Sequence, residues 1–505
     1  MPISEFFPKA TPESLGIPSG AIQDFLEEMA EEKLNIHGVI IMRDGKVAAE
    51  AYYKPFAADK PHRMYSTTKS FVSVAIGLLC DEGRVSLSDK VTKFFPDKLP
   101  DKVHQYTEAM TVRDLLMMSS AHKNTTYGRV DDPDEDWVGT FFTETPTHWP
   151  GQVFSYDTSA TTVLTAIVER VSGKLFIEYM KDRMLRKMGF SEDAFCVKTG
   201  DGRFSWGGSG LVCTLRDLAR FAYVTMNVGE WFGEQLISKE YMTAATSRQI
   251  DNSVTRRAEG YGYKFWRWPE NGFGCAGMGT QNTFCYPEEN GLICAVIADT
   301  QPHPYGAALV QKAFLRNVKH NISDALPEDK QAQDKLCAYI EKLEVSPMDG
   351  ELHSPTAKEI NGKKYILESN GARGGMDFKS VKFAFENGGG SMFLEGEGGV
   401  NEIKFGFGGF AEQDFPGYNT REEMAGEPVC AYGFGPKCKL NLNCINSAAW
   451  VSPKTLVIVC YAIGTFVGTL KIEVAFDGDH VTIACAKFAE RFWENYTGFQ
   501  SGVAL

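Results

Sequence analysis

Residues 64–79 read MYSTTKSFVSVAIGLL, and this stretch carries the strongest indication of the fold. Bulky apolar residues recur in it at the spacing of an α-helix, and Gly83 is expected to end that helix. The residues of the apolar stripe are Phe71, Val74, Ala75, Leu78 and Leu79. Ser66 and Lys69 lie three positions apart at its start, so on one turn of helix they share a face.

The start of a helix is a favourable place for a nucleophilic serine. Its free backbone N–H groups and the positive end of its dipole would stabilise an oxyanion. If Lys69 is buried, desolvation favours its neutral form, which can take the proton of Ser66. The alternative is an N-cap serine with a lysine that faces solvent, and residues 64–79 alone do not decide between the two.

A second Ser-x-x-Lys motif runs from Ser120 to Lys123. A chain of this composition should contain about two such matches by chance, so the motif alone is weak. Ser120 follows a predicted helix and runs into a polar loop without an apolar stripe. The context therefore favours Ser66 as the reactive serine.

Length and charge limit the classes of protein. A chain of 505 residues predicts two or three domains. The formal net charge of −13 disfavours nucleic acid and anionic membranes as partners. The sequence shows neither a basic start followed by an apolar run nor about 18 consecutive apolar residues. We therefore expect a cytoplasmic protein without a membrane span.

The cysteines are expected to be reduced thiols rather than bridges. Twelve cysteines are scattered along the chain, and no export signal is recognised. Cys430, Cys438 and Cys444 lie fairly close together, but their spacings are not the short pairs that bind zinc. No metal and no cofactor are expected.

The first part of the chain predicts helices packed on an antiparallel sheet, an α+β fold. Asp44-Gly45 separates two apolar runs and suits a type I′ hairpin. Thr111 and Thr214 are each followed by aspartate three residues later, as N-caps are, and a further helix should end at Gly173. Strands are predicted in the stretches YGYKFW (261–266), NTFCYPE (282–288) and GLICAVIAD (291–299).

The composition changes after about residue 315. Residues 326–345 are charged and compatible with a helical connector. Short apolar runs separated by Gly, Asn and Asp follow, which predicts an antiparallel barrel or sandwich. The expected domains are residues 1–325, the connector 326–345, and an all-β domain over residues 346–505.

The sequence resembles serine hydrolases of the class C β-lactamase, DD-peptidase and esterase type. The resemblance covers about residues 10–315, and the C-terminal part is a looser match to the lipocalin-like β-barrel tails that some of these hydrolases carry. The segments that carry it include VIIMRDGKVAAEAYY, MYSTTKSFVSVAIGLL, MTVRDLLMMSSA, WPGQVFSYDTSATTVLTAIVERVSGK, WGGSGLVCTLRDLARFA and FGCAGMGTQNTFCYPEENGLICAVIAD. It implies a β-lactamase/transpeptidase-like fold.

The resemblance implies three sequence boxes in the active site. Ser66 and Lys69 match the Ser-x-x-Lys box. Tyr156, after PGQVF, matches the tyrosine of Tyr-x-Asn, while Thr158 replaces the asparagine. A tyrosine held near a lysine can act first as a base and then as an acid toward the leaving group.

The third box is Lys or His, any residue, then Gly, on an edge strand that faces the serine. In GCAGMGTQ, Cys275 takes the Lys/His position and Gly277 the glycine. The amide of Met278 is then expected to be the second oxyanion donor, beside that of Ser66. Gln281 on the same strand is a candidate substrate contact.

Further residues bear on the choice of substrate. Trp206 is either a lining residue of the acyl pocket or a structural tryptophan. Cys275 carries no charge at neutral pH unless it is activated, and Asp157 adds a negative charge beside Tyr156. Both differences disfavour an anionic β-lactam as the substrate.

The leading hypothesis is a serine hydrolase that forms an acyl-enzyme with small esters, or with amides and peptides that include a D-residue. The alternatives are a β-lactamase or DD-peptidase that recognises penicillin, and a non-catalytic binding protein that keeps the pocket. The expected partner is a small molecule or peptide. The C-terminal domain is expected either to cap the cleft or to mediate a homodimer.

Overall fold

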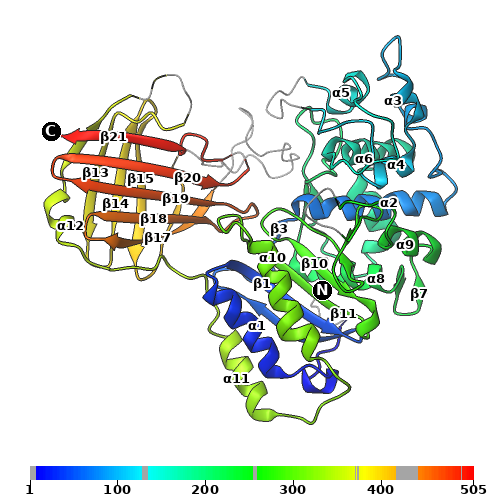
Figure 1. Ribbon diagram of the computed structural model, residues 1–505, viewed down its shortest axis with the longest axis horizontal. Coiled ribbons are helices and arrows are strands. Elements are labelled where there is room, and N and C mark those ends of the chain that lie inside the picture. Colours follow the sequence, from blue (N-terminus) through cyan, green and yellow to red (C-terminus); the bar gives the residue numbers. More distant parts are fainter. Residues whose placement is uncertain are drawn as a thin grey trace. The chain divides into compact units, whose positions relative to one another are not determined.

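A computed structural model describes residues 7–127, 135–253, 259–369, 371, 375–416, 442–490 and 492–505. The chain forms two compact units (Figure 1). The first contains the described residues up to Thr300 together with Tyr305–Glu344. The second contains Gln301–Pro304 and the described residues from Val345 to Leu505. The domain boundaries predicted from the sequence stay a prediction.

The first unit contains mixed helices and strands. Its helices are α1 (Ser19–Glu31), α2 (Thr68–Asp81), α3 (Gln105–Ala109), α4 (Val112–Leu116), α5 (Trp137–Thr143), α6 (Thr158–Ser172), α7 (Phe176–Met180), α8 (Leu215–Met226), α9 (Lys239–Thr246), α10 (Gly306–Ala313) and α11 (Lys330–Ile340). Its strands are β1 (Asn35–Arg43), β2 (Lys46–Tyr52), β3 (His62–Arg63), β4 (Phe195–Cys196), β5 (Leu211–Cys213), β6 (Glu230–Trp231), β7 (Glu234–Gln235), β8 (Trp266–Arg267), β9 (Phe273–Gly274), β10 (Asn282–Tyr286) and β11 (Leu292–Asp299).

An antiparallel sheet organises this unit. Its strand order is β2-β1-β11-β10-β9-β8. The turn between β1 and β2 has φ of 52° at Asp44 and 67° at Gly45, which is the pair of positive values that a type I′ turn requires. The predicted hairpin is confirmed, and it places the sheet's first two strands in register.

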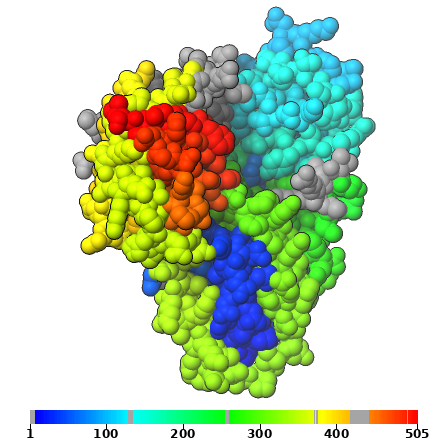
Figure 2. All heavy atoms as spheres, turned by 60° about the vertical axis from the view of Figure 1, so that its left-hand side comes forward, coloured from blue at the N-terminus to red at the C-terminus, as the bar shows by residue number. Residues whose placement is uncertain are grey.

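Helices lie against both faces of this sheet (Figure 1). Because side chains alternate along a strand, Phe284 and Tyr286 of β10 share one face, where both contact the ring of Phe314. Phe25 of α1 packs on Phe314 as well. Helix α8 packs against β10 and β11. Figure 2 shows the blue surface of α1 flanked by green surface from later in the chain, consistent with its contacts to α10 and α11.

Helix α2 is buried on all sides, not along one stripe. Every residue from Thr68 to Leu79 is buried, and each fully buried Val, Leu, Ile or Phe side chain contributes about 1.5–3 kcal/mol to stability. Its polar side chains are hydrogen-bonded: Ser70 Oγ donates to the carbonyl of Lys264 at 2.6 Å, and Ser73 Oγ lies 3.1 Å from the hydroxyl of Tyr241. Helices α6, α7 and α9 surround it.

The predicted helix ends are confirmed. Thr111 and Thr214 each form a capping box with the aspartate three residues later. Helix α6 ends at Gly173, whose φ of 74° is the left-handed conformation that glycine adopts without strain.

Two strand predictions are wrong in detail. Residues 261–265 do not form a strand, because Lys264 has a φ of 63° and its backbone leaves the extended region; only Trp266–Arg267 pair, as β8. Gln281 does not lie on an edge strand. It precedes β10, which is paired on both sides by β9 and β11.

The second unit is a β-barrel. Its described elements are α12 (Pro355–Ile360), β12 (Lys364–Leu367), β13 (Ser380–Glu386), β14 (Gly389–Gly396), β15 (Gly399–Phe407), β16 (Ala411–Asp414), β17 (Asn443–Ser452), β18 (Thr455–Ala462), β19 (Thr469–Asp477), β20 (His480–Phe488) and β21 (Gly498–Ala504). The order is β15-β14-β13-β12-β21-β20-β19-β18-β17-β16, and β15 also pairs with β17.

The pairing of β15 with β17 closes the barrel and leaves β16 outside the ring. Strand directions can alternate around a closed ring only if the number of strands is even. This ring has nine strands among the described residues, so one neighbouring pair must be parallel, and β15–β17 is that pair. The alternative of an open sandwich is thereby excluded for this unit.

The cysteines of the described residues are all free thiols, as predicted. Cys430 and Cys438 lie outside the described residues, so the expectation that they and Cys444 bind no zinc stays a prediction. Within the described part of the chain, no helix has both the length and the apolar character that crossing a bilayer requires.

Candidate active site

Ser66 and Lys69 meet at the start of α2. Ser66 lies in a short 3₁₀ turn, Tyr65–Thr67, that leads directly into the helix, so positions i and i+3 face the same side. Lys69 Nζ donates to Ser66 Oγ at 2.9 Å. Ser66 is half-buried, whereas Lys69 is only 1% exposed. This is the geometry that proton transfer between the two groups requires.

A glycine turn holds the other side of the lysine. Lys69 Nζ also donates to the carbonyl of Gly208 at 2.5 Å. A Cβ on Gly208 would lie 2.5 Å from Thr158 Cγ2, and one on Gly207 would lie 1.8 Å from Thr165 Oγ1. The GGSG segment therefore needs glycine because α6 packs directly on its backbone.

Tyr156 lies beside Lys69 at the surface of the unit. Lys69 Nζ is 5.1 Å from the centroid of the Tyr156 ring, so the contact is with the face of the ring. The ring stacks on Trp266 with centroids 5.8 Å apart, yet Tyr156 remains 37% exposed. A bound substrate can therefore reach it from solvent.

The segment Cys275–Gln281 packs against the serine turn. Thr67 Oγ1 donates to the carbonyl of Gln281 at 2.5 Å. A Cβ on Gly277 would lie 2.3 Å from the carbonyl oxygen of Met64, so only glycine fits where the two backbones meet. Within the described residues, no hydrogen bond is recorded for the amides of Ser66 and Met278. Both N–H groups are thus available to an oxyanion.

Cys275 is a buried thiol. It is 1% exposed, and burial raises the pKa of the thiol to about 11, so it is neutral at pH 7. Its backbone pairs with Thr283, whose hydroxyl accepts from the amide of Cys275 at 2.9 Å. Cys275 therefore adds no charge to the site.

Two further predicted residues lie in the protein interior. Trp206 is 3% exposed and donates from Nε1 to the hydroxyl of Tyr127 at 3.0 Å. Gln281 is fully buried, and its amide nitrogen donates to the carbonyls of Met278 and Ala298 at 3.1 and 2.6 Å. Gln281 thus stabilises the turn that carries Met278 instead of facing solvent.

Asp157 is buried at the first turn of α6. One of its oxygens accepts from the amide and hydroxyl of Ser159, and the other accepts from Ser120 Oγ at 2.8 Å. The carboxylate therefore caps the helix, whose dipole favours its charge. Ser120, the serine of the second Ser-x-x-Lys motif, serves as its hydrogen-bond donor.

Lys264 is a buried residue near the site that the sequence did not indicate. It is 1% exposed, and burial, followed by the charge of Lys69, lowers its pKa well below its usual value. A lysine between four aromatic residues in YGYKFW was the available signal, but nothing in the sequence links it to Ser66.

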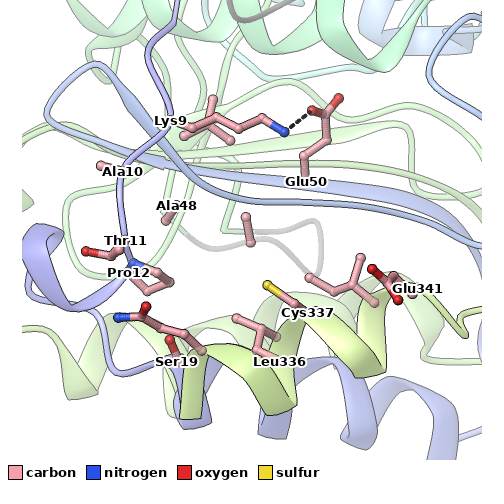
Figure 3. Close-up of a pocket in the computed structure, with 14 residues that line it drawn as sticks. Lys9, Ala10, Thr11, Pro12, Ser19, Ala48, Glu50, Leu336, Cys337 and Glu341 are labelled. Carbon is pink, nitrogen blue, oxygen red and sulfur yellow. Dashed lines mark ion pairs between the residues drawn. The ribbon is translucent and has the colours of Figure 1, made fainter. Parts of the chain in front are cut away.

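A separate pocket of about 540 Å³ lies between α11, β2 and the N-terminal segment (Figure 3). Leu336 and Cys337 line it from the helix, opposite Ala48. Lys9 and Glu50 form an ion pair at its rim, 3.8 Å between Nζ and Oε2. The residues that line this pocket include none of the predicted site residues.

Comparison with known proteins assigns the family. A family model described as Beta-lactamase matches residues 22–316. Because this match covers more than half of the 505 residues, the chain belongs to the Beta-lactamase family. The resemblance stated from the sequence is confirmed.

Curated relatives are distant. The chain is 26% identical over 285 residues to the 6-aminohexanoate-dimer hydrolase of Paenarthrobacter ureafaciens, covering 54% of this chain and 69% of the relative. It is 25% identical over 177 residues to protein flp of Staphylococcus aureus (strain MW2), covering 31% of this chain and 34% of the relative. The second match thus spans about a third of the relative's length.

Solved structures share the fold. One is a Bacillus anthracis protein provisionally described as a 6-aminohexanoate-dimer hydrolase, with a TM-score of 0.53 and 20% identity over 64% of this chain and 89% of that one. Another, provisionally described as a β-lactamase, is from Bacteroides dorei, with a TM-score of 0.50 and 18% identity over 58% of this chain and 97% of that one. The predicted fold class is confirmed.

Proposed function

We propose that this chain is a serine hydrolase that forms an acyl-enzyme on Ser66. The observation that carries the proposal is the 2.9 Å hydrogen bond between Ser66 Oγ and the buried amine of Lys69. Family membership and the hydrolase relative support the same class of reaction. In its neutral form Lys69 accepts the proton of Ser66 while the serine oxygen attacks the substrate carbonyl.

Tyr156 is proposed to deliver the proton to the leaving group. It is exposed and lies against Lys69 through its ring, with no hydrogen bond recorded between its hydroxyl and that amine in the described residues. Its phenol is therefore proposed to act once substrate is bound, when it can bond the leaving atom. The amides of Ser66 and Met278 are the proposed oxyanion donors.

The substrate is proposed to be a small ester or amide, including peptides with a D-residue, without a carboxylate at the position of Cys275. A neutral buried thiol there cannot pair with an anionic group, and Asp157 adds negative charge nearby. The name of the Paenarthrobacter relative describes the hydrolysis of a dimer of 6-aminohexanoate, an amino acid, which supports amides among the candidates. A penicillin-recognising enzyme is the less favoured alternative.

The test is covalent labelling with a fluorophosphonate probe. Wild type and Ser120→Ala should be labelled, whereas Ser66→Ala should not. Labelling of Ser66→Ala equal to that of wild type would show that the nucleophile is elsewhere. If the folded wild-type protein is not labelled at all, a non-catalytic binding role replaces the proposal. The cytoplasmic location and a homodimer stay predictions from the sequence.

A further inference from the structure

Strand β2 forms one edge of the main sheet, and within the described residues only its two ends have a partner on the outer side. At its start, Val47 accepts a hydrogen bond from the amide of Ala10 at 3.1 Å and donates one to the carbonyl of Pro8 at 3.0 Å. Just after its end, the amide of Lys54 donates to the carbonyl of Leu343 at 3.0 Å. The outer edge between these two pairings is therefore a gap along the strand.

The main chain of Glu50 and Tyr52 faces this gap. The amide of Tyr53 donates inward to the carbonyl of His37 at 3.0 Å, whereas the amide of Lys54 points outward. Because main-chain groups alternate between the two sides of a strand, those of Tyr52 and Glu50 point outward as well. In the described part of the chain, no main-chain hydrogen bond on the outer side is recorded for either residue. Their two N–H and two C=O groups form a short free edge.

The pocket of about 540 Å³ beside α11 lies at this gap (Figure 3). Residues 47–50 all line it, although successive side chains of a strand point to opposite faces of the sheet. A pocket that contacts both faces lies beside the strand, at its edge. The side chain of Glu50 is 6% exposed, yet the residue as a whole is half-buried, so part of its exposed surface belongs to the main chain.

The walls of the pocket are apolar in the middle and charged at the two ends. Leu336 and Ile340 of α11 line it opposite the strand. Lys9, whose side chain is 65% exposed, lies where β2 starts. Glu341 follows the last residue of α11 at the other end, where its carbonyl accepts from the amine of Lys54 at 3.1 Å. The C-terminus of a helix favours cations, so the two ends of the gap differ in the charge that they attract.

We propose that the outer edge of β2 binds an extended peptide, which adds to the sheet as a further strand. An exposed strand edge is a template for such pairing, in which main-chain hydrogen bonds hold the peptide and neighbouring pockets select its side chains. Residues 48–53 span about 20 Å of strand, which is room for about five extended residues. The proposal goes beyond the proposed hydrolase activity and does not depend on the role of Ser66.

The flanking chains determine the direction and the chemistry of the peptide. The pairings at Lys9 and at Glu344 are both parallel to β2, so a peptide that continues their line also runs parallel to β2. Its amino end then lies beside Lys9 and its carboxyl end beside Glu341. An acidic first residue, apolar residues in the middle and a basic last residue match the walls of the pocket.

The same flanking chains disfavour a second copy of this protein as the occupant. Strand β2 is seven residues long, and both ends of its outer edge are already covered by residues 8–10 and 343–344. An edge-to-edge pairing of two β2 strands would have to displace these chains, whereas a short peptide fits between them.

The experiment titrates the full chain into the peptide Asp-Val-Leu-Val-Lys amide, labelled with fluorescein at its amino end, and follows the fluorescence anisotropy. The protein carries Ser66→Ala, so that the peptide is not consumed. Two further peptides are N-methylated, one at the second and fourth residues and the other at the third and fifth. Only one side of a bound strand faces β2. One methylated peptide should therefore bind about tenfold more weakly than the parent, and the other as tightly as the parent.

Two tryptophan variants locate the binding site. Cys337→Trp fills the pocket from α11, and Ala338→Trp places the same side chain on the next residue, which is exposed and does not line the pocket. Binding of the parent peptide should be lost in Cys337→Trp and kept in Ala338→Trp.

Three results would each overturn the inference. They are no binding of the parent peptide, equal affinities for the two N-methylated peptides, and unchanged binding in folded Cys337→Trp. A dimer on size-exclusion chromatography that Cys337→Trp removes and Ala338→Trp keeps, without peptide binding, would overturn it in favour of a second copy at this edge.

Discussion

The chain contains the Ser-x-x-Lys motif twice, and the two copies lie in different structural environments. Lys69 of the first copy is buried and bonds Ser66, whereas Lys123 of the second copy is exposed and Ser120 bonds Asp157. The first copy enters a helix, where residues three apart share a face. The second lies in an irregular segment, so the same spacing brings nothing together. The backbone around the motif, not the motif, determines its chemistry.

The largest effect is expected at Lys69, with Lys123 as its control. Lys69→Met removes the proposed base, so fluorophosphonate labelling of Ser66 should fall about 10³-fold. Lys123→Met should label at the wild-type rate, because that lysine is exposed and outside the site. Equal labelling rates in Lys69→Met and Lys123→Met would contradict the difference proposed between the two Ser-x-x-Lys motifs.

Two buried histidines, one of which lies just before the Ser66 motif, should make the fold sensitive to acid. His62 and His37 are buried, with 3.1 Å between Nε2 of the first and Nδ1 of the second. Burial lowers the pKa of His62 from 6.5 to about 4. Above pH 6.5 both the folded and the unfolded state are neutral there. Between pH 6.5 and about 4 only the unfolded state takes up the proton, so the free energy of unfolding should fall by up to about 3 kcal/mol.

Urea unfolding at pH 7 and pH 4.5 measures this loss. His62→Gln does not titrate, so its stability should depend less on pH over the same range, whatever its stability at pH 7. Burial, and then the charge of His62, also lower the pKa of His37, which adds a loss of the same sign. An unchanged pH dependence in His62→Gln would contradict the assignment.

Gly277 lies where its own backbone closely approaches the backbone of Met64, just before Ser66. In Gly277→Ala the new Cβ would meet the carbonyl oxygen of Met64, so the turn that carries Met278 must shift. Displacing one oxyanion donor should lower the labelling rate about 10²-fold. Gly20→Ala is the control, because a Cβ there meets nothing within 4 Å. A wild-type rate in Gly277→Ala would show that Met278 is not a donor.

The smallest effect is expected at the second serine. Ser120→Ala removes one donor from buried Asp157, which keeps its bonds to Ser159. The free energy of unfolding should fall by about 1–3 kcal/mol, measured with urea. Labelling of Ser66 in the folded variant should persist. Loss of labelling without loss of stability would show that Ser120 takes part in catalysis, contrary to its place as a hydrogen-bond donor to Asp157.

Local signals predicted much of the fold. The hairpin at Asp44-Gly45, the capping boxes of α4 and α8 and the end of α6 at Gly173 each depend on residues within one turn of each other. The closure of the C-terminal barrel could not be predicted from such local patterns. The choice between barrel and sandwich depended on the pairing of β15 with β17, which joins residues about 40 positions apart.

The candidate site was predictable where a motif fixes the local geometry. Ser66 and Lys69 meet because a helix brings them together. Lys264 was missed because its contacts with Ser70 and Met118 join distant segments through a left-handed residue. Gln281 was expected to face substrate, but bonds to Met278 and Ala298 hold it in the interior. Such burial depends on tertiary packing that a single sequence does not display.

The role of Ser66 as the nucleophile is tested most directly by locating the acyl group. Wild-type protein is mixed with an activated ester, quenched with acid, and examined by intact mass and peptide mapping. One acyl group per chain is expected, on Ser66. An adduct on Ser120 or on any other residue, or ester turnover with no adduct even at the earliest times, would contradict it.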